Sequence, residues 1–361
     1  MNEVDFSKAR HLRWPRSLRG LLLGMLAVSV LLPQASWGTA SRLQEGPPRS
    51  SSPTTSMLQR PVSAAESSKD ARDPNANASG AVCPPFRDRT VGRWGWVGFP
   101  WGSRLFPRRL SQVRNWALAI GRDLDGATMR LLPRYDLVVV DGEAVTQSQV
   151  RVLKASGVIV LGYLSVGTIE RNRSWYGEVR AYRLDLWGDW DEWYADAGAP
   201  GYRDVIERQV APSMLAKGLD GLFLDNTDMI ESHPAQSEGM RLLVAALSAQ
   251  THTTGKWLFT QNGIDSIAPS LACYDGWNLE DVTWSYDFDT GRYVRRSRTD
   301  IAAGLRALRR VRAKGLLTLS TDYVKKGNRR ATTEAVRKAR SVGAIPFVSN
   351  IWLTRLPPPP R

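Results

Sequence analysis

Short apolar runs recur along the chain from Trp116 onward, separated by polar or glycine-containing stretches. Near-continuous apolar runs are typical of strands buried on both faces, as in a parallel sheet. We predict strands at residues 116–120, 137–140, 158–163, 221–224, 257–260, 275–279, 316–319 and 345–348.

Longer stretches with helical character lie between these runs, and several of them end in glycine just before the next run. Glycine just past a helix fits a left-handed C-terminal cap. We predict helices at residues 146–155, 202–217, 236–250, 300–314 and 332–342. Eight strands separated by helices predict an α/β fold of the (β/α)₈ TIM-barrel class. A doubly wound open sheet is the alternative.

The N-terminal region has a different pattern. Arginines precede an apolar stretch that runs from Leu21 to Leu32, and small residues follow it. Residues 1–38 therefore read as a signal peptide or an uncleaved signal anchor, so we expect an exported protein, secreted or held in the cell envelope. Residues 39–90, rich in Ser, Pro and Ala, read as a disordered linker. The catalytic domain is expected to span 91–356, with a possible membrane tether in front of it.

Charge and cysteine content narrow the possible functions. The net charge is +14, with arginines spread along helical stretches such as 305–312. We interpret these as solvated helix faces and expect no nucleic acid partner; a basic scaffold that binds anionic polymers is the alternative.

Cys83 and Cys273 could pair in an exported protein or remain free. With only three histidines, a multi-His metal site is excluded, and we expect neither metal nor cofactor.

Polar residues follow most of the predicted strands. The carboxyl ends of parallel strands form one face of a barrel, where ligands bind. Candidate substrate-binding residues at these ends are Asp141, Ser165, Asn226, Gln261, Asn262, Asp281, Asp322, Tyr323 and Asn350.

Asp225 and Glu280 are the candidate catalytic residues because each directly follows a buried apolar run. Two carboxylates that flank one bond are what glycoside hydrolysis requires, one as an acid and one as a nucleophile or base. The neighbouring Asp281 would raise the proton affinity of Glu280, as a general acid needs. The alternatives are an Asp225 that binds loop amides and a Glu280 that pairs with an arginine. The spacing of the two carboxyl groups, which decides retention or inversion, stays open.

Aromatic residues support a carbohydrate ligand. Six of them crowd the connection after the third strand, with acids interleaved: Trp175, Tyr176, Trp187, Trp190, Trp193 and Tyr194. Sugar rings stack on such side chains, and the acids would attract a cationic polymer. An ordinary core under a long loop is the alternative.

Motifs in this order resemble glycoside hydrolase family 114, the endo-α-1,4-polygalactosaminidase-like group, over roughly residues 110–355. The motifs are Tyr163-Leu-Ser-Val-Gly167 followed by Glu170, the segment 218–226, Gln261-Asn262-Gly263, Asn278-Leu-Glu-Asp281 and Asp322-Tyr323. One departure lies at Thr168, where the family often has an acid.

The resemblance implies a TIM barrel that hydrolyses α-1,4 bonds in galactosamine polymers without a metal. It also implies Asp225 as nucleophile, Glu280 as acid/base and Glu170 among the substrate-binding residues. We expect a monomer acting on an amino-sugar polysaccharide. The alternative that the Thr168 departure leaves open is a non-catalytic polysaccharide-binding barrel.

Overall fold

The computed structural model describes residue 83 and residues 110–358. The expected signal segment (1–38) and almost all of the expected linker (39–90) lie outside the described residues. The expected domain (91–356) is described from residue 110 onward.

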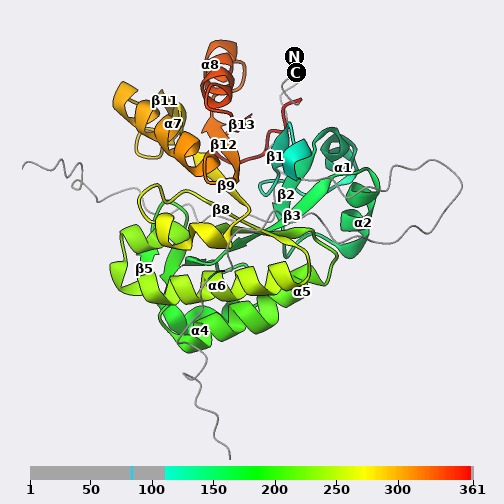
Figure 1. Cartoon of the computed structure of the whole chain (residues 1–361), viewed down its shortest axis with the longest axis vertical. Coiled ribbons are helices and arrows are strands. Elements are labelled where there is room, and N and C mark those ends of the chain that lie inside the picture. The colour runs from blue at the N-terminus through cyan, green and yellow to red at the C-terminus, as the bar shows by residue number, and fades with distance from the viewer. Residues whose placement is uncertain (1–82, 84–109, 359–361) are drawn as a thin grey trace, which may run out of the picture. The chain divides into compact units, whose positions relative to one another are not determined.

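Eight parallel strands form one sheet in the order β1-β2-β3-β7-β8-β9-β12-β13. Their bounds are β1 Trp116–Leu118, β2 Leu137–Asp141, β3 Ile159–Ser165, β7 Gly221–Asp225, β8 Trp257–Gln261, β9 Gly276–Glu280, β12 Leu317–Tyr323 and β13 Ile345–Ser349. The first and last strands approach each other, and Trp116 Nε1 donates to the Ile345 carbonyl oxygen at 2.9 Å. All eight predicted strands are present, and the nearly closed barrel confirms the predicted (β/α)₈ fold (Figure 1).

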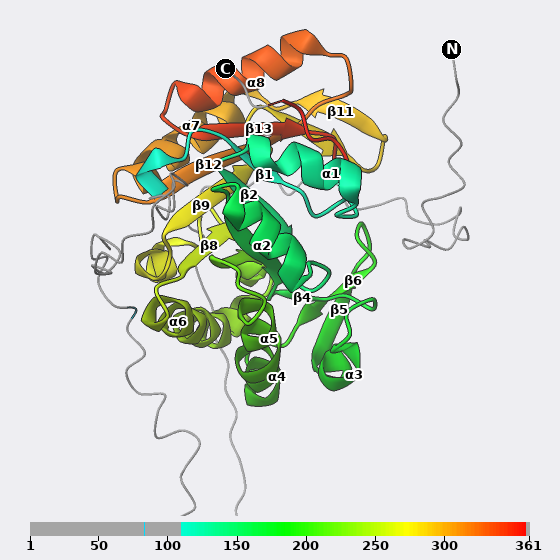
Figure 2. The same ribbon diagram turned by 90° about the vertical axis from the view of Figure 1, so that its right-hand side faces the viewer.

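Helices cover the outside of the barrel (Figures 1 and 2). The α-helices are α1 Gly126–Leu131, α2 Gln147–Ala155, α3 Tyr176–Val179, α4 Pro200–Val205, α5 Ala211–Leu215, α6 Ser237–Thr253, α7 Arg298–Arg312 and α8 Arg329–Arg340. The 3₁₀ turns are Leu110–Gln112, Leu132–Arg134, Arg180–Tyr182, Thr227–Glu231, Pro234–Gln236 and Ala268–Cys273. The predicted helix 146–155 is α2, which begins with a capping box formed by Thr146 and Gln149.

The helix predicted at 202–217 is interrupted in the structure. It consists of α4, a π-helical turn Ile206–Val210 and α5, which follow one another directly. Pro212 lies in the first turn of α5. Proline has no N–H to donate, and its ring clashes with the carbonyl four residues earlier in a regular helix. A π turn at this point accommodates that proline.

Two insertions on the barrel are not predicted from the apolar pattern. After β3 the chain forms a three-stranded sheet of β4 Thr168–Ile169, β5 Arg183–Trp187 and β6 Glu192–Ala195, with α3 between β4 and β5. After β9 it forms a hairpin of β10 Trp284–Asp287 and β11 Arg292–Arg295. Both insertions follow the carboxyl ends of barrel strands, the face where ligands bind in this fold.

The inner face of the barrel changes from aromatic to polar along the strands. Near its base, Trp116 packs against Phe223 and Phe347, with ring centroids 6.4 and 5.5 Å apart. Because side chains alternate across a strand, the residue two positions after Phe223 faces the same way. That residue is Asp225, so the barrel core supports a polar layer above it.

Cys83 and Cys273 form a disulfide, which resolves the alternative left open by the sequence. Within residues 110–358, every helix is too short or too polar to cross a lipid bilayer.

Candidate active site

Asp225 is the last residue of β7 and faces the barrel interior. The Tyr163 hydroxyl donates to its Oδ2 at 2.5 Å, and Gln261 Nε2 donates to its Oδ1 at 2.6 Å. The Asn226 backbone N–H also donates to Oδ1, at 2.7 Å. The residue is only 8% exposed, and burial raises the pKa of Asp225 while the three hydrogen bonds oppose that rise. These donors stabilise the ionised form of the carboxylate.

Glu280 ends β9 and is held by a similar pair of donors, a tyrosine hydroxyl and a side-chain amide. Asn262 Nδ2 donates to its Oε2 at 2.9 Å, and the Tyr323 hydroxyl donates to its Oε1. Burial, followed by the negative charge of Asp225, raises the pKa of Glu280 to about 8. The side chain is therefore protonated at neutral pH, as a general acid must be.

A hydrogen-bonded layer connects the strands that carry the two carboxylates. Gln261 donates to Asp225 and accepts from Asn278 Nδ2 at 3.1 Å. Asn278 in turn accepts from the Thr321 hydroxyl at 3.1 Å. Asn278 lies two residues before Glu280 on the same strand and so faces the same side. The structure thus brings Asp225 and Glu280 to one polar layer at the barrel mouth.

Left-handed residues follow three consecutive strands at this mouth. Asn226, Asn262 and Asp281 have φ angles of 58°, 60° and 55°, and each comes directly after the last residue of β7, β8 or β9. Asn and Asp tolerate this conformation better than other residues with a Cβ. Such residues concentrate at functional sites, where the surrounding structure holds them.

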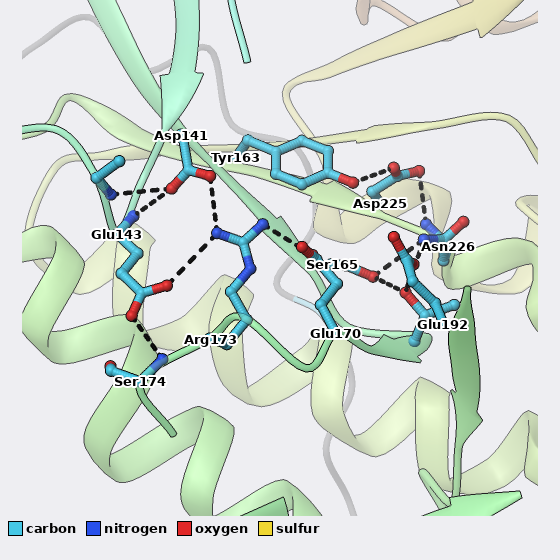
Figure 3. Close-up of polar contacts among 12 residues, drawn as sticks. Asp141, Glu143, Tyr163, Ser165, Glu170, Arg173, Ser174, Glu192, Asp225 and Asn226 are labelled. Atoms are coloured by element: carbon cyan, nitrogen blue, oxygen red, sulfur yellow. Dashed lines mark hydrogen bonds and ion pairs between the residues drawn. The ribbon is translucent and has the colours of Figure 1, made fainter. Parts of the chain in front are cut away.

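Arg173 is surrounded by acids on the other side of the mouth (Figure 3). Its guanidinium donates to Asp141 Oδ2 and to Glu170 Oε1, both at 2.7 Å, and lies 3.5 Å from Glu143 Oε2. Glu170 is 14% exposed, and burial raises its pKa while Arg173 opposes that rise. Asp141 and Glu170, two of the predicted substrate-binding residues, thus share one cation.

A second network joins Ser165 and Asn226 to residues of the insertion after β3 (Figure 3). Asn226 Nδ2 donates to Ser165 Oγ at 3.0 Å and to Thr168 Oγ1 at 3.1 Å. Thr168 Oγ1 donates to Glu192 Oε2 at 2.7 Å. A carboxylate therefore lies next to Thr168, although it comes from β6.

Asp281, Asp322 and Asn350 lie at strand ends, and Asp322 and Asn350 make hydrogen bonds to the segments that follow β9 and β13. Asp322 is 1% exposed, and its Oδ1 accepts from the backbone N–H groups of Thr283 and Trp284 at 2.6 and 2.7 Å. Burial raises the pKa of Asp281 to about 6 and that of Asp322 to about 7. Asn350 donates to Thr354 Oγ1 at 2.8 Å. Substrate contact by these three residues stays a prediction.

Aromatic side chains from three connections meet beside the mouth. Trp190 of the β5–β6 turn lies 5.3 Å from Phe288 and 6.0 Å from Trp352, measured between ring centroids. Trp187 stacks on Tyr194 at 5.7 Å. Trp352 is 48% exposed. Trp187, Trp190 and Tyr194 of the crowded connection thus form an aromatic cluster with Phe288 and Trp352. The other three rings carry arginines: Arg183 packs on Trp193 and Tyr176, and Arg173 on Trp175.

A groove of about 740 Å³ borders the site between α6 and the 3₁₀ turn Ala268–Cys273. It reaches the strand ends through Thr227 and Asn262, and neither Asp225 nor Glu280 lines it. It therefore extends beside the two carboxylates and does not contain them.

Three contributors were missed as functional residues in the sequence. Tyr163 is part of an apolar run, Arg173 is one arginine among many, and Glu192 is one acid of an aromatic-rich connection. The only available signal was the Tyr163-Leu-Ser-Val-Gly167 motif, which places Tyr163 two residues before Ser165. Among the described residues, no group of three or more His, Cys, Asp or Glu side chains is arranged to hold a metal ion.

Solved structures that match this chain include glycoside hydrolase domains. The PelA domain from Pseudomonas aeruginosa is 24% identical, with a TM-score of 0.58, covering 68% of this chain and 97% of that one. A variant of the same PelA domain matches at 22% identity and a TM-score of 0.59, again covering 68% and 97%. Ega3 from Aspergillus fumigatus, solved with galactosamine, is 16% identical with a TM-score of 0.54, covering 71% and 97%. These likenesses support the barrel fold.

A search of curated proteins finds no significant match. The family model described as glycoside-hydrolase family GH114 matches residues 106–355, which is most of the chain and includes every strand of the barrel. The chain therefore belongs to glycoside-hydrolase family GH114, and it is a glycoside hydrolase.

Proposed function

We propose that this enzyme hydrolyses α-1,4 glycosidic bonds in a galactosamine-containing exopolysaccharide, using Asp225 and Glu280 and no metal. The observation that carries the proposal is that the two carboxylates meet in one hydrogen-bonded polar layer at the barrel mouth. Burial raises the pKa of both groups; three hydrogen bonds to Asp225 favour its charged form, and the pKa of Glu280 is raised to about 8. A general acid needs a proton affinity near the working pH, and hydrogen-bond donors favour the ionised nucleophile.

In the proposed reaction, Glu280 gives its proton to the glycosidic oxygen as the bond to the anomeric carbon breaks. Asp225 attacks that carbon and forms a covalent glycosyl ester. Water then attacks the same carbon, Glu280 takes a proton from this water, and the Asp225 carboxylate leaves. Tyr163 and Gln261 hold Asp225 in place through both carboxylate oxygens. Retention of the anomeric configuration is the expected outcome of this assignment.

The proposed substrate class follows from the charge of the mouth and from a structural relative. Ega3 was solved with galactosamine, and its fold is shared by this chain. The Arg173 guanidinium contacts the carboxylates of Asp141, Glu143 and Glu170, and Glu192 and Asp225 add two further acids to the mouth (Figure 3). A polymer that carries ammonium groups complements such a surface.

We further propose that residues 1–38 direct export and that residues 39–90 are a linker. The enzyme would then act as a monomer on a substrate in the cell envelope or outside it.

The test is digestion of α-1,4-linked galactosamine polymers, deacetylated and N-acetylated, with the products identified by mass spectrometry. We expect shorter oligomers from the wild type, and a rate reduced by about 10²–10⁴-fold for Asp225→Asn and Glu280→Gln. Asp204→Asn, on the outer helix α4, is the matched control and should keep full activity. Retention of the polymer without new reducing ends would contradict hydrolysis and favour a polysaccharide-binding barrel.

A further inference from the structure

Glu192 enters the mouth from an insertion rather than from a barrel strand. It is the first residue of β6, which pairs with β4 so that Thr168 lies opposite Tyr194. This pairing brings the Glu192 carboxylate to the Thr168 hydroxyl, 2.7 Å away (Figure 3). Hairpin register, rather than a strand end, therefore places this acid beside the proposed nucleophile.

The hydrogen bonds around Glu192 run in one direction. When the Thr168 hydroxyl donates to Glu192, its oxygen is left to accept from Ser165 and from Asn226. Asn226 also donates through its backbone to Asp225. Asn226 thus donates directly to Asp225 and, through the Thr168 hydroxyl, is linked to Glu192. This network fixes the position of Glu192 relative to Asp225. Only Glu192 Oε2 is used in this network; Oε1 accepts no hydrogen bond from the described residues.

The charge around Glu192 is not balanced by the protein. Arg173 is the cation of this region, and its hydrogen bonds go to Asp141 and Glu170. Glu192 makes no ion pair with any described residue. The negative charges that raise the pKa of Glu192 are those of Glu170 and Asp225. A partly buried carboxylate next to others of the same sign is stabilised by a cation supplied from outside.

We propose that Glu192 binds the ammonium group of a galactosamine unit at the cleavage site and thereby selects deacetylated polymer over N-acetylated polymer. This inference rests on the proposed function. An ammonium group supplies both the missing charge and a donor for Oε1. An N-acetyl group supplies neither a charge nor more than one N–H, and it is larger.

The protonation of Glu192 supports this role. Burial, then the charges of Glu170 and Asp225, raise the pKa of Glu192 to about 8, while Thr168 and Arg173 oppose that rise. At pH 7 the free side chain is therefore mostly protonated. Binding of an ammonium group favours the ionised form, so a proton leaves when the amino sugar binds.

The experiment measures kcat and KM on deacetylated and on N-acetylated polymer for the wild type and for Glu192→Gln. Loss of a charge-assisted hydrogen bond predicts a fall of about ten- to a hundredfold in kcat/KM on the deacetylated polymer, mainly through KM. The N-acetylated polymer should change by less than about threefold. Glu178→Gln is the matched control, because Glu178 is an exposed acid of the same insertion. Adding Thr168→Glu to Glu192→Gln returns a carboxylate to nearly the same place and should recover the preference.

An equal loss on both polymers would overturn the proposal, because a purely structural role affects every substrate alike. Calorimetric titration with galactosamine oligomers at pH 7, in two buffers of different ionisation enthalpy, provides a readout independent of turnover. We expect clearly less proton release for Glu192→Gln than for the wild type, because other carboxyl groups of the mouth with a raised pKa remain; equal release would also overturn the proposal. If the wild type cleaves neither polymer, the proposed function fails, and this titration still decides whether Glu192 binds the ammonium group.

Discussion

The outer helices and the barrel mouth differ in how far their charged side chains are exposed to water. The outer helices α7 and α8 contain ten Lys and Arg but only two acids, Asp300 and Glu334. Most of these basic side chains are exposed. At the barrel mouth, by contrast, Arg173 is 10% exposed and is shared by Asp141, Glu170 and Glu143.

The difference shows that burial, and not the number of charges, gives a charge its structural role. In α8, small residues such as Ala331, Ala335 and Ala339 face the core, and the arginines face water. Water and salt screen such charges, so changing one of them has a small effect on stability. A charge at the mouth is partly removed from water, and changing it leaves a neighbour uncompensated.

The same substitution in the two regions should therefore have very different effects on stability. Arg173→Gln removes the cation shared by three carboxylates and should lower the free energy of unfolding by about 3–5 kcal/mol. Arg309→Gln, on the exposed face of α7, should change it by no more than about 0.5 kcal/mol. Denaturant unfolding of both variants checks this. Similar losses would mean that the comparison between mouth and outer helices is wrong.

Tyr323→Phe tests how the mouth sets the proton affinity of Glu280. The Tyr323 hydroxyl donates to Glu280, which lowers the pKa of that carboxyl against the effect of burial. Without this bond the pKa rises further, so the alkaline limb of the pH–kcat/KM profile should move above pH 8. Loss of positioning should reduce the rate by about ten- to a hundredfold. An alkaline limb that stays in place or moves to lower pH would contradict the role of Glu280 as the acid.

The mouth should also make stability depend on pH. Glu280 and Glu192 have folded pKa values of about 8, above the ordinary glutamate value of 4.5. The folded state thus binds protons more tightly, so the resulting stabilisation is present at low pH and is lost as the pH rises from about 4.5 through 8. We expect the melting temperature to fall between about pH 5 and about pH 9. Glu280→Gln should make the melting temperature depend less on pH. A pH dependence unchanged from the wild type would contradict a raised pKa of Glu280.

The smallest effect concerns the outer helices. If the exposed basic residues are solvated helix faces, the double variant Arg309→Gln, Arg337→Gln should leave kcat/KM on deacetylated polymer within about twofold of the wild type. Salt should raise KM on this cationic substrate in both proteins by the same factor, because the attraction arises at the mouth. A salt dependence that changes with the double variant would show that the outer helices take part in substrate binding.

The sequence located the strands and the two carboxylates because both signals are local. Buried apolar runs precede Asp225 and Glu280 directly, and the parallel barrel brings their ends to one face. The helix at 202–217 was placed correctly but not its π turn, because one proline changed the hydrogen-bonding pattern without changing the helical periodicity.

The remaining site residues depend on pairings between distant segments. Glu192 reaches Thr168 only because β6 pairs with β4, and β4 has just two residues. Such a short strand leaves almost no periodic signal. In the sequence, Arg173 likewise has no feature that distinguishes it from the exposed arginines. Its role follows only from its ion pairs with three acids in the structure. Local patterns thus placed the two candidate carboxylates at strand ends, and tertiary contacts decide which charges surround them.

The disulfide has a consequence for how a polymer reaches the enzyme. Cys273 ends the turn that leads into β9, so it lies at the amino-terminal end of the strands, away from the mouth. Cys83 is fixed there, 190 residues earlier in the chain. The crosslink therefore lies at the end of the barrel opposite the mouth. A long glycan can cross the mouth without meeting this fixed point of the chain.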